Sequence, residues 1–186
     1  MTLSPPSGDP DIRRLYEADR RDHAKEPRLG TKARAGQVER DRKRRAELGE
    51  IISRGGLREP IDHCRAAAVF LHGETVEEMG LARQCALACV EGGYEPGRRI
   101  AAEALDRWLM LQGSPQKFGT QTVPDGTRFR LWDVEPATTE EERAEWGVPS
   151  LAELETQAEE RSKRERQPPL EAMPAWLQAA VRRWSA

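Results

Sequence analysis

The sequence predicts a mainly α protein: a compact helical bundle with one small β-hairpin and flexible basic segments at both ends. Apolar residues recur at spacings of three and four through most of residues 37–166, the periodicity of helices that pack on a core. Glycine pairs and capping residues separate these segments, and only residues 120–133 alternate as strands do. We therefore expect a mobile N-terminal arm at 1–36, a bundle domain at 37–166 and a C-terminal tail at 167–186.

The composition indicates a soluble chain that is large enough to bury a core. Of 186 residues, 37% are hydrophobic and 33% are charged, with 30 basic against 32 acidic side chains. This balance gives no general attraction to nucleic acid or to an acidic membrane, and no apolar run is long enough to span a bilayer. The three cysteines, Cys64, Cys85 and Cys89, are an odd number in apolar surroundings, which indicates buried thiols in a reducing compartment. We expect a cytoplasmic protein.

The N-terminal arm is defined by its composition. Residues 1–10 are rich in Pro, Ser and Gly, as disordered segments are. Residues 11–24 can form a short helix, but charge dominates it, and residues 25–36 are typical of a linker. A solvated basic tail and a binding element are both consistent with this arm.

Asp41 and His72 are polar residues that stand out in the two helices after the arm. Residues 37–54 form a helix whose core-facing stripe contains Asp41, with Arg45 one turn further on. A surface Asp41–Arg45 pair and a site carboxylate both fit this pattern. His72 follows the helix predicted from Pro60 to Leu71, where it is either a capping cation or a proton-transfer or ligand-binding group.

The next helix begins with a capping box of Thr75 and Glu78 and ends at Gly92-Gly93. Its buried side contains Cys85 and Cys89, which are spaced as two metal ligands on one helix face can be. Because no second pair with ligand spacing follows, ordinary core packing is favoured.

Residues 100–121 are the most unusual stretch of the chain. Their helical half is apolar on nearly every side, yet it contains Asp106 and Arg107. Gly113 and Pro115 end this helix and lead into a polar loop at 116–121. A buried Asp106 needs hydrogen-bond donors, and Arg107 or the backbone of this loop can supply them.

The C-terminal third combines a hairpin with helices. Strand-like alternation on both sides of the turn Pro124-Asp125-Gly126 predicts the hairpin at 120–133. Ser150 and Glu153 form a capping box for a further helix. In the tail, Trp176 and Trp184 lie on one face of a short helix, which either packs on the same chain or docks on a partner protein or a membrane surface.

The familiar catalytic motifs are missing, among them the Walker loop, the nucleophile elbow and paired C-x-x-C motifs. Instead, a set of polar residues is predicted to face the interior. These are Asp41, His72, Asp106, Arg107, Gln116, Thr120 and Gln121. Arginine and glutamine amides together bind carboxylate, phosphate or a polarised carbonyl, and histidine or aspartate accepts a proton. The alternative is a polar network that only fastens the loop to the bundle.

The run Ala104-Leu105-Asp106-Arg107 and the loop from Gly113 to Gln121 resemble a bacterial family of uncharacterised domains. The signature of that family is a D-R helix followed by G-x-P-Q-x-[Y/F]-G-T-Q, and the likeness covers roughly residues 37–155. The segment before His72 reads Val-Phe-Leu, where the family has an aromatic residue and a glutamine. The resemblance implies a mostly helical fold and a shared polar site, but no particular activity.

These observations predict a small enzyme or ligand-handling protein that acts on an anionic or carbonyl-containing small molecule by acid/base chemistry. Hydrolysis, elimination and cyclisation all need only such groups, and no cofactor is predicted. The predicted catalytic residues are His72, Asp106 and Asp41, and the predicted substrate-binding residues are Arg107, Gln116, Thr120 and Gln121.

Two other hypotheses belong to different functional classes. One is a protein-interaction module, such as an adaptor or immunity protein, that docks through Trp176, Trp184 and the basic arms. The other is a metal site that joins His72 to Asp41 or Asp106. The metal hypothesis is the weaker of the two, because recognisable ligand spacing is lacking and no metal is predicted.

Overall fold

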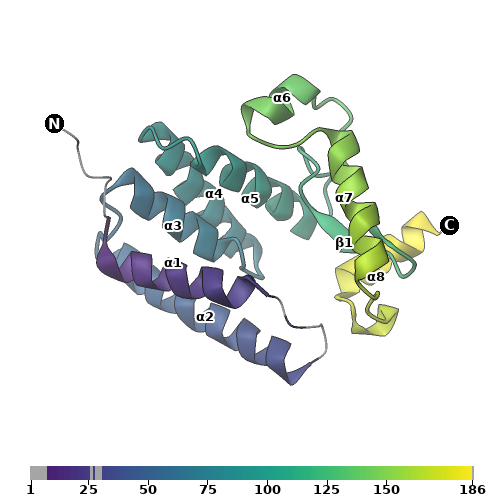
Figure 1. The fold of residues 1–186 in the computed structure, drawn as a ribbon, viewed down its shortest axis with the longest axis horizontal. Helices are drawn as coiled ribbons and strands as arrows, with labels where there is room; N and C mark the ends of the chain where they lie inside the picture. Colours follow the sequence, from purple (N-terminus) through teal and green to yellow (C-terminus); the bar gives the residue numbers. More distant parts are fainter. Residues whose placement is uncertain (1–7, 26, 28–30, 186) are drawn as a thin grey trace. The chain divides into compact units, whose positions relative to one another are not determined.

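A computed structural model describes residues 8–25, 27 and 31–185, and Figure 1 shows the course of the chain. The described residues form a mainly α fold with eight α-helices and one two-stranded antiparallel sheet, which confirms the predicted fold class. The chain divides into two compact units, Met1–Ala104 and Leu105–Ala186. This boundary falls inside a helix and differs from the predicted single domain at 37–166, so each unit is described by itself.

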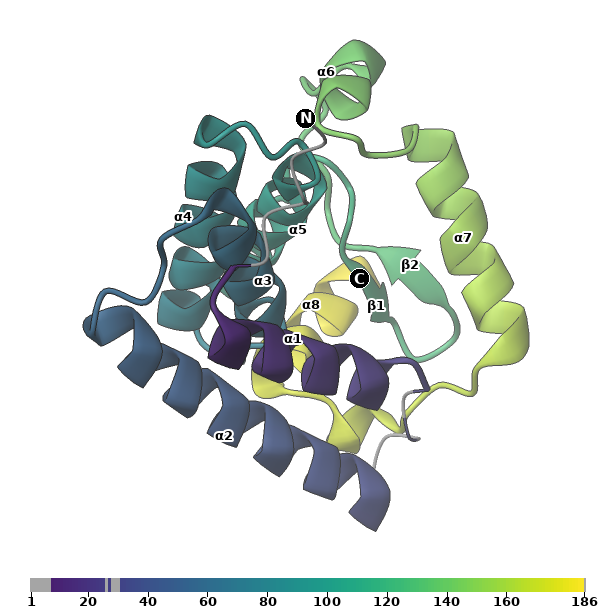
Figure 2. The same cartoon turned by 60° about the vertical axis from the view of Figure 1, so that its left-hand side comes forward.

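The first unit consists of helices joined by short turns. Helix α1 packs against α2 and α3, and α3 packs closely against α4; Figure 2 shows α1 beside α2 from a second direction. Alanines allow the close approach of α3 and α4, because they add little bulk between the two backbones. The elements are α1 (Pro10–His23), α2 (Lys32–Ser53), α3 (Pro60–Phe70), α4 (Val76–Glu91) and the first part of α5 (Gly97–Leu111).

Helix α1 is part of this packed unit, although it lies within residues 1–36, for which a mobile arm is predicted. Ile12 and Leu15 are 0% and 2% exposed, so the two apolar residues are enough to seat a helix whose other faces are charged. Asp62 of α3 accepts a 2.7 Å hydrogen bond from the backbone N–H of Asp9, just before α1 begins. Residues 1–7, 26 and 28–30 of the predicted arm lie outside the described residues.

The second helix is longer than the sequence suggests. Helix α2 begins at Lys32 instead of Gln37, because Thr31 acts as its N-cap and accepts a hydrogen bond from the backbone N–H of Arg34. Gly36 lies inside the helix and does not interrupt it. The capping box of Thr75 and Glu78 starts α4 as predicted.

The second unit contains the hairpin and the C-terminal helices. Strands β1 (Thr122–Pro124) and β2 (Phe129–Leu131) pair in antiparallel register, with Val123 opposite Arg130, and α7 packs along β2. The predicted hairpin is therefore confirmed. The helical elements of this unit are the remainder of α5, α6 (Glu140–Glu145), α7 (Leu151–Arg164), a short 3-10 helix η1 (Leu170–Ala172) and α8 (Ala175–Trp184).

Helix α8 is packed within the second unit, although it lies within residues 167–186, for which a separate tail is predicted. Trp132 of the hairpin is the centre of this packing, because the rings of Trp176 and Trp184 meet its ring edge-on, with centroids at 5.7 and 5.4 Å. The Nε1–H of Trp184 also donates to Asp133 at 2.9 Å. These contacts favour packing on the same chain over docking on a partner.

None of the helices in the described part of the chain combines the length and apolar character that a membrane crossing requires.

Candidate functional site

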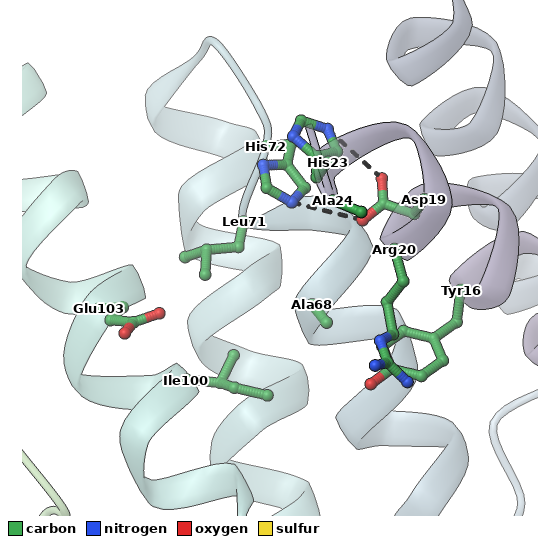
Figure 3. A pocket seen from close by; sticks show the side chains of 10 residues that line it. All are labelled: Tyr16, Asp19, Arg20, His23, Ala24, Ala68, Leu71, His72, Ile100 and Glu103. Atoms are coloured by element: carbon green, nitrogen blue, oxygen red, sulfur yellow. Dashed lines mark ion pairs between the residues drawn. The ribbon is translucent and has the colours of Figure 1, made fainter. Parts of the chain in front are cut away.

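The first unit contains a pocket of about 430 Å³ between α1, the end of α3 and α5. Figure 3 shows that Asp19, His23 and His72 gather at one end of it, whereas Arg20 and Glu103 lie apart from them, with Ala68, Leu71 and Ile100 between. The lining residues are Tyr16, Asp19, Arg20, His23, Ala24, Ala68, Leu71, His72, Ile100 and Glu103. A pocket with a few converging polar groups and an apolar wall is the usual form of a small-molecule site.

His23 and His72 lie face to face at one side of this pocket. Their ring centroids are 3.5 Å apart and the ring planes differ by 6°. Nε2 of His72 lies 3.3 Å from Oδ2 of Asp19, and Nε2 of His23 lies 3.9 Å from Oδ1 of the same carboxylate (Figure 3). Asp19 and His23 are one turn apart on α1, whereas His72 follows α3. The three side chains form what we call the histidine cluster.

Asp19 is the most constrained member of the histidine cluster. Its side chain is 4% exposed, and among the described residues its Oδ1 accepts no hydrogen bond. The Nε of Arg44 lies 3.4 Å from this oxygen, close enough for an ion pair but without a hydrogen bond. A buried carboxylate oxygen without a hydrogen-bond donor lowers the stability of the fold. A further partner for Asp19 would remove this penalty.

Asp41 supports the histidine cluster from α2. Both of its carboxylate oxygens lie 3.3 Å from Nε2 of His23, and it also forms an ion pair with Arg44. On the other side of the ring, the amide nitrogen of Gln37 lies 3.4 Å from Nδ1 of His23. Because an amide nitrogen can only donate, this contact favours the tautomer in which Nε2 of His23 carries the proton and faces Asp41.

The predicted partner of Asp41 was wrong. Arg44, and not Arg45, pairs with it, since Arg45 turns toward α4 and donates from Nε to Glu78 at 2.6 Å. Arg45 also donates from Nη1 to the backbone carbonyl of His72 at 3.0 Å, which fixes the turn that presents His72 to the pocket. Consecutive residues point about 100° apart around a helix, so Arg44 and Arg45 are directed at different neighbours, and the packing of α1 and α4 decides their partners.

In the second unit, the carboxylate of Asp106 is buried, and both of its oxygens accept hydrogen bonds. Its residue is 0% exposed, and it accepts hydrogen bonds from the backbone N–H groups of Lys117, Phe118 and Thr120 and from the hydroxyl of Thr120, at 2.7–2.9 Å. Burial raises the pKa of Asp106, and the four hydrogen bonds act against that rise. Asp106 thus anchors the loop that follows its own helix.

Gln116 fastens the other side of the same loop. Its side-chain amide donates to the backbone carbonyls of Gln121 and Trp132, each at 3.0 Å, and accepts from the backbone N–H of Gln121 at 2.7 Å. Gln121 donates from its own side chain to Thr120 at 3.1 Å, and Arg107 is half-buried on α5. These bonds are those of a structural network, the alternative that the sequence leaves open.

Gly119 allows the loop to take this form. Its φ angle is 95°, and a Cβ at this position would lie 3.2 Å from a methyl group of Leu154. A residue with a side chain would be strained by this φ angle and crowded by the methyl group, which explains the glycine in the G-T-Q step of the loop.

The seven predicted site residues fall into two groups. Asp41 and His72 lie in the first unit and are joined through the histidine cluster. The other five lie in the second unit, where hydrogen bonds connect Asp106, Gln116, Thr120 and Gln121. A single site that unites the two groups stays a prediction.

Asp19 and His23 are not among the residues predicted for the site, because the many charges of their segment are typical of a solvated arm. A signal was present, since Ile12, Leu15 and Asp19 continue one stripe at spacings of three and four, and His23 follows one turn later. Asp and His usually lie on solvent-exposed helix faces, so a stripe that ends in these residues does not by itself indicate burial.

The cysteines behave as predicted, as buried core residues. All three are buried and in the thiol form. Burial raises the pKa of Cys85 to about 11 and that of Cys89 to about 12, so neither readily provides the thiolate that bonds to metals or attacks substrates.

A scan of the chain against protein-family models found no match, and searches of curated proteins and of solved structures found none either. The family resemblance of the G-T-Q loop therefore stays a prediction, and the functional argument depends on the geometry of the two units.

Proposed function

We propose that this protein binds an anionic or carbonyl-containing small molecule in the pocket of the first unit and acts on it by acid/base chemistry. The observation that carries the proposal is the contact of His72 with the buried Asp19 at the wall of the pocket, 3.3 Å from Nε2 to Oδ2. A carboxylate in this position holds the imidazole in one orientation, which a general base requires.

The exposures of the two side chains suit these roles. The His72 side chain is 32% exposed and that of Asp19 only 4%, so the imidazole is much the more accessible of the two groups to a bound molecule. With Nε2 directed at Asp19, the other ring nitrogen of His72 points away from the carboxylate, as Figure 3 shows. Nδ1 is therefore the atom that would exchange a proton with a bound molecule.

Of the two other charged side chains that line the pocket, Arg20 favours a small molecule with a negative or polarised group, whereas Glu103 adds a second carboxylate. The guanidinium of Arg20 lines the pocket and lies 5.8 Å from the centre of the Tyr16 ring. It provides a cation for a carboxylate or phosphate group, and Leu71 and Ile100 provide an apolar surface for the rest of the ligand. Hydrolysis, elimination or cyclisation would each need only these groups.

A binding experiment in the presence of a metal chelator tests the proposal. The chain contains only three histidines, so their ring signals in an NMR spectrum can be assigned by substitution. Titration with acetate and with inorganic phosphate is expected to shift the signals of His23 and His72 and to leave that of His63 in place. The Arg20→Ala variant should weaken binding several-fold, because Arg20 is exposed and its loss removes a charge without disturbing the core.

Turnover is the second measurement. Hydrolysis of a chromogenic carboxylic ester should fall at least about tenfold in His72→Ala and stay unchanged in His63→Ala. If neither anion shifts the His72 signal and the two variants hydrolyse the ester equally, the pocket is not an acid/base site.

A further inference from the structure

We propose that the histidine cluster, Asp19, His23 and His72, is a binding site for one divalent transition-metal ion of the Zn²⁺ type. The inference rests on the proposed function only in taking this pocket as the working site. Two observations carry it: three ligand atoms that converge, and a buried carboxylate oxygen that lacks a hydrogen-bond donor.

The ligand atoms are already gathered. One oxygen of Asp19 and one ring nitrogen each of His23 and His72 all lie within 4.8 Å of one another. Bonds of about 2.1 Å from one ion to these atoms bring ligand atoms to roughly 3.3 Å apart, so the largest separation has to shrink by at most about 1.5 Å. Two imidazoles and a carboxylate are ligands that zinc and its neighbours accept, whereas Mg²⁺ and Ca²⁺ prefer oxygen ligands alone.

Asp19 gives the second, independent observation. A side chain that is 4% exposed and has an oxygen without a donor is the kind of buried polar group that an ion satisfies. The carboxylate also lines the pocket, so an ion bound to it would have further coordination positions directed at the pocket. Three protein ligands with a remaining position for water or ligand are typical of catalytic zinc sites and not of structural ones.

The surroundings of the cluster indicate what has to change when an ion binds. Parallel rings 3.5 Å apart direct their nitrogen lone pairs along parallel lines, so the rings of His23 and His72 must tilt to meet at one ion. His23 must also carry its proton on Nδ1 and give up the 3.4 Å contact with the amide nitrogen of Gln37. With the ion bound, His72 is a ligand instead of a base, and the ion takes over the polarisation of a carbonyl or a water molecule.

Zn²⁺ titration of the chelator-treated full-length chain tests the inference, with calorimetry to give the stoichiometry and NMR to follow the three histidines. We expect one ion per chain, large shifts of His23 and His72, and no shift of His63. His72→Ala should weaken Zn²⁺ binding at least about tenfold, because it removes one of three ligands. His63→Ala is the matched control and should bind as the natural chain does.

Two further measurements keep the test decisive. Asp19→Asn should also weaken binding, but because Asp19 is buried, a loss of folding in that variant would leave the decision to His72→Ala, whose side chain is one-third exposed. Co²⁺ gives an absorption spectrum in which a thiolate charge-transfer band would reveal binding to cysteine, and we expect no such band.

The inference is overturned if Zn²⁺ binds with less than about a tenth of an equivalent, if His72→Ala binds as tightly as the natural chain, or if Co²⁺ shows the thiolate band. None of these results bears on the acid/base proposal, because acetate and phosphate binding is measured in the presence of a chelator. Conversely, if Zn²⁺ binds at these residues but neither acetate nor phosphate binds, the metal site is supported and the proposed small-molecule function is overturned.

Discussion

The two units each bury an aspartate, but they satisfy it in opposite ways. Asp106 of the second unit receives four hydrogen bonds from one loop, and every donor comes from the segment that it organises. Asp19 of the first unit meets two imidazoles and a guanidinium from three different helical segments, and one of its oxygens still lacks a donor. A polar network in which every group has a hydrogen-bond partner stabilises a fold. A network beside a pocket in which one group lacks a partner is a candidate for a binding or catalytic site.

Removal of the Asp106 carboxylate should have the largest effect on stability. Asp106→Ala leaves three backbone N–H groups and one hydroxyl, all buried or partly buried, without their acceptor, and it should lower the free energy of unfolding by about 3–5 kcal/mol. Urea unfolding measures this, with the exposed Glu155→Ala as a control that should stay within about 0.5 kcal/mol. Equal midpoints for the two variants would show that the loop does not depend on Asp106.

Gln116→Ala should cause the second-largest loss of stability. The substitution removes two donors and one acceptor at a residue that is 0% exposed, so we expect a loss of about 2–4 kcal/mol. Gln112 is the matched control, since it is exposed and its side chain donates to the backbone carbonyl of Trp108 in the helix just before it. A Gln116→Ala chain as stable as Gln112→Ala, with altered ligand binding, would move Gln116 from the structural group to the functional one.

A smaller effect is expected from Asp22, which joins the end of α1 to α2. Hydrogen bonds from Arg40, with those from Arg44, lower the pKa of Asp22 to about 2. A lowered pKa means that the folded chain prefers the ionised carboxylate, so its contribution is full above the ordinary pKa of 3.8 and is lost as the pH falls through about 2. Because the pair is partly solvated, we expect only about 1 kcal/mol.

The measurement is the difference in unfolding free energy between the natural chain and Asp22→Asn as the pH is lowered. This difference should shrink between pH values of about 4 and about 2 and vanish below that range. A difference that is constant across this range would mean that the carboxylate of Asp22 does not hold α1 to α2.

The smallest effect on stability should come from His72, the residue with the largest expected effect on binding. Its side chain is partly exposed and lies after the end of α3, so His72→Ala should change the free energy of unfolding by no more than about 1 kcal/mol. Thermal unfolding beside the Zn²⁺ and anion titrations separates the two effects. A large loss of stability in His72→Ala would assign the histidine cluster to the same structural class as the Asp106 network.

Much of the local structure could be predicted from the sequence, because local signals determine it. The capping boxes at Thr75 and Ser150 mark helix starts, and the Asp125-Gly126 turn forms the hairpin between β1 and β2. The burial of Asp41 also followed from the helical period of α2. In contrast, the role of Asp106 as a loop anchor required knowledge of which backbone N–H groups reach it.

The sequence by itself determined the fold class, most helix positions and the fact that several charged residues lie inside. Only the tertiary structure decided which of these charges meet. Asp19 and His23 come from a helix that looks solvated, and they meet His72 only because α1 packs on α2 and α3. The physical reason is that periodicity reports which face of a helix is buried, whereas the partner of a buried charge depends on contacts between segments far apart in the chain.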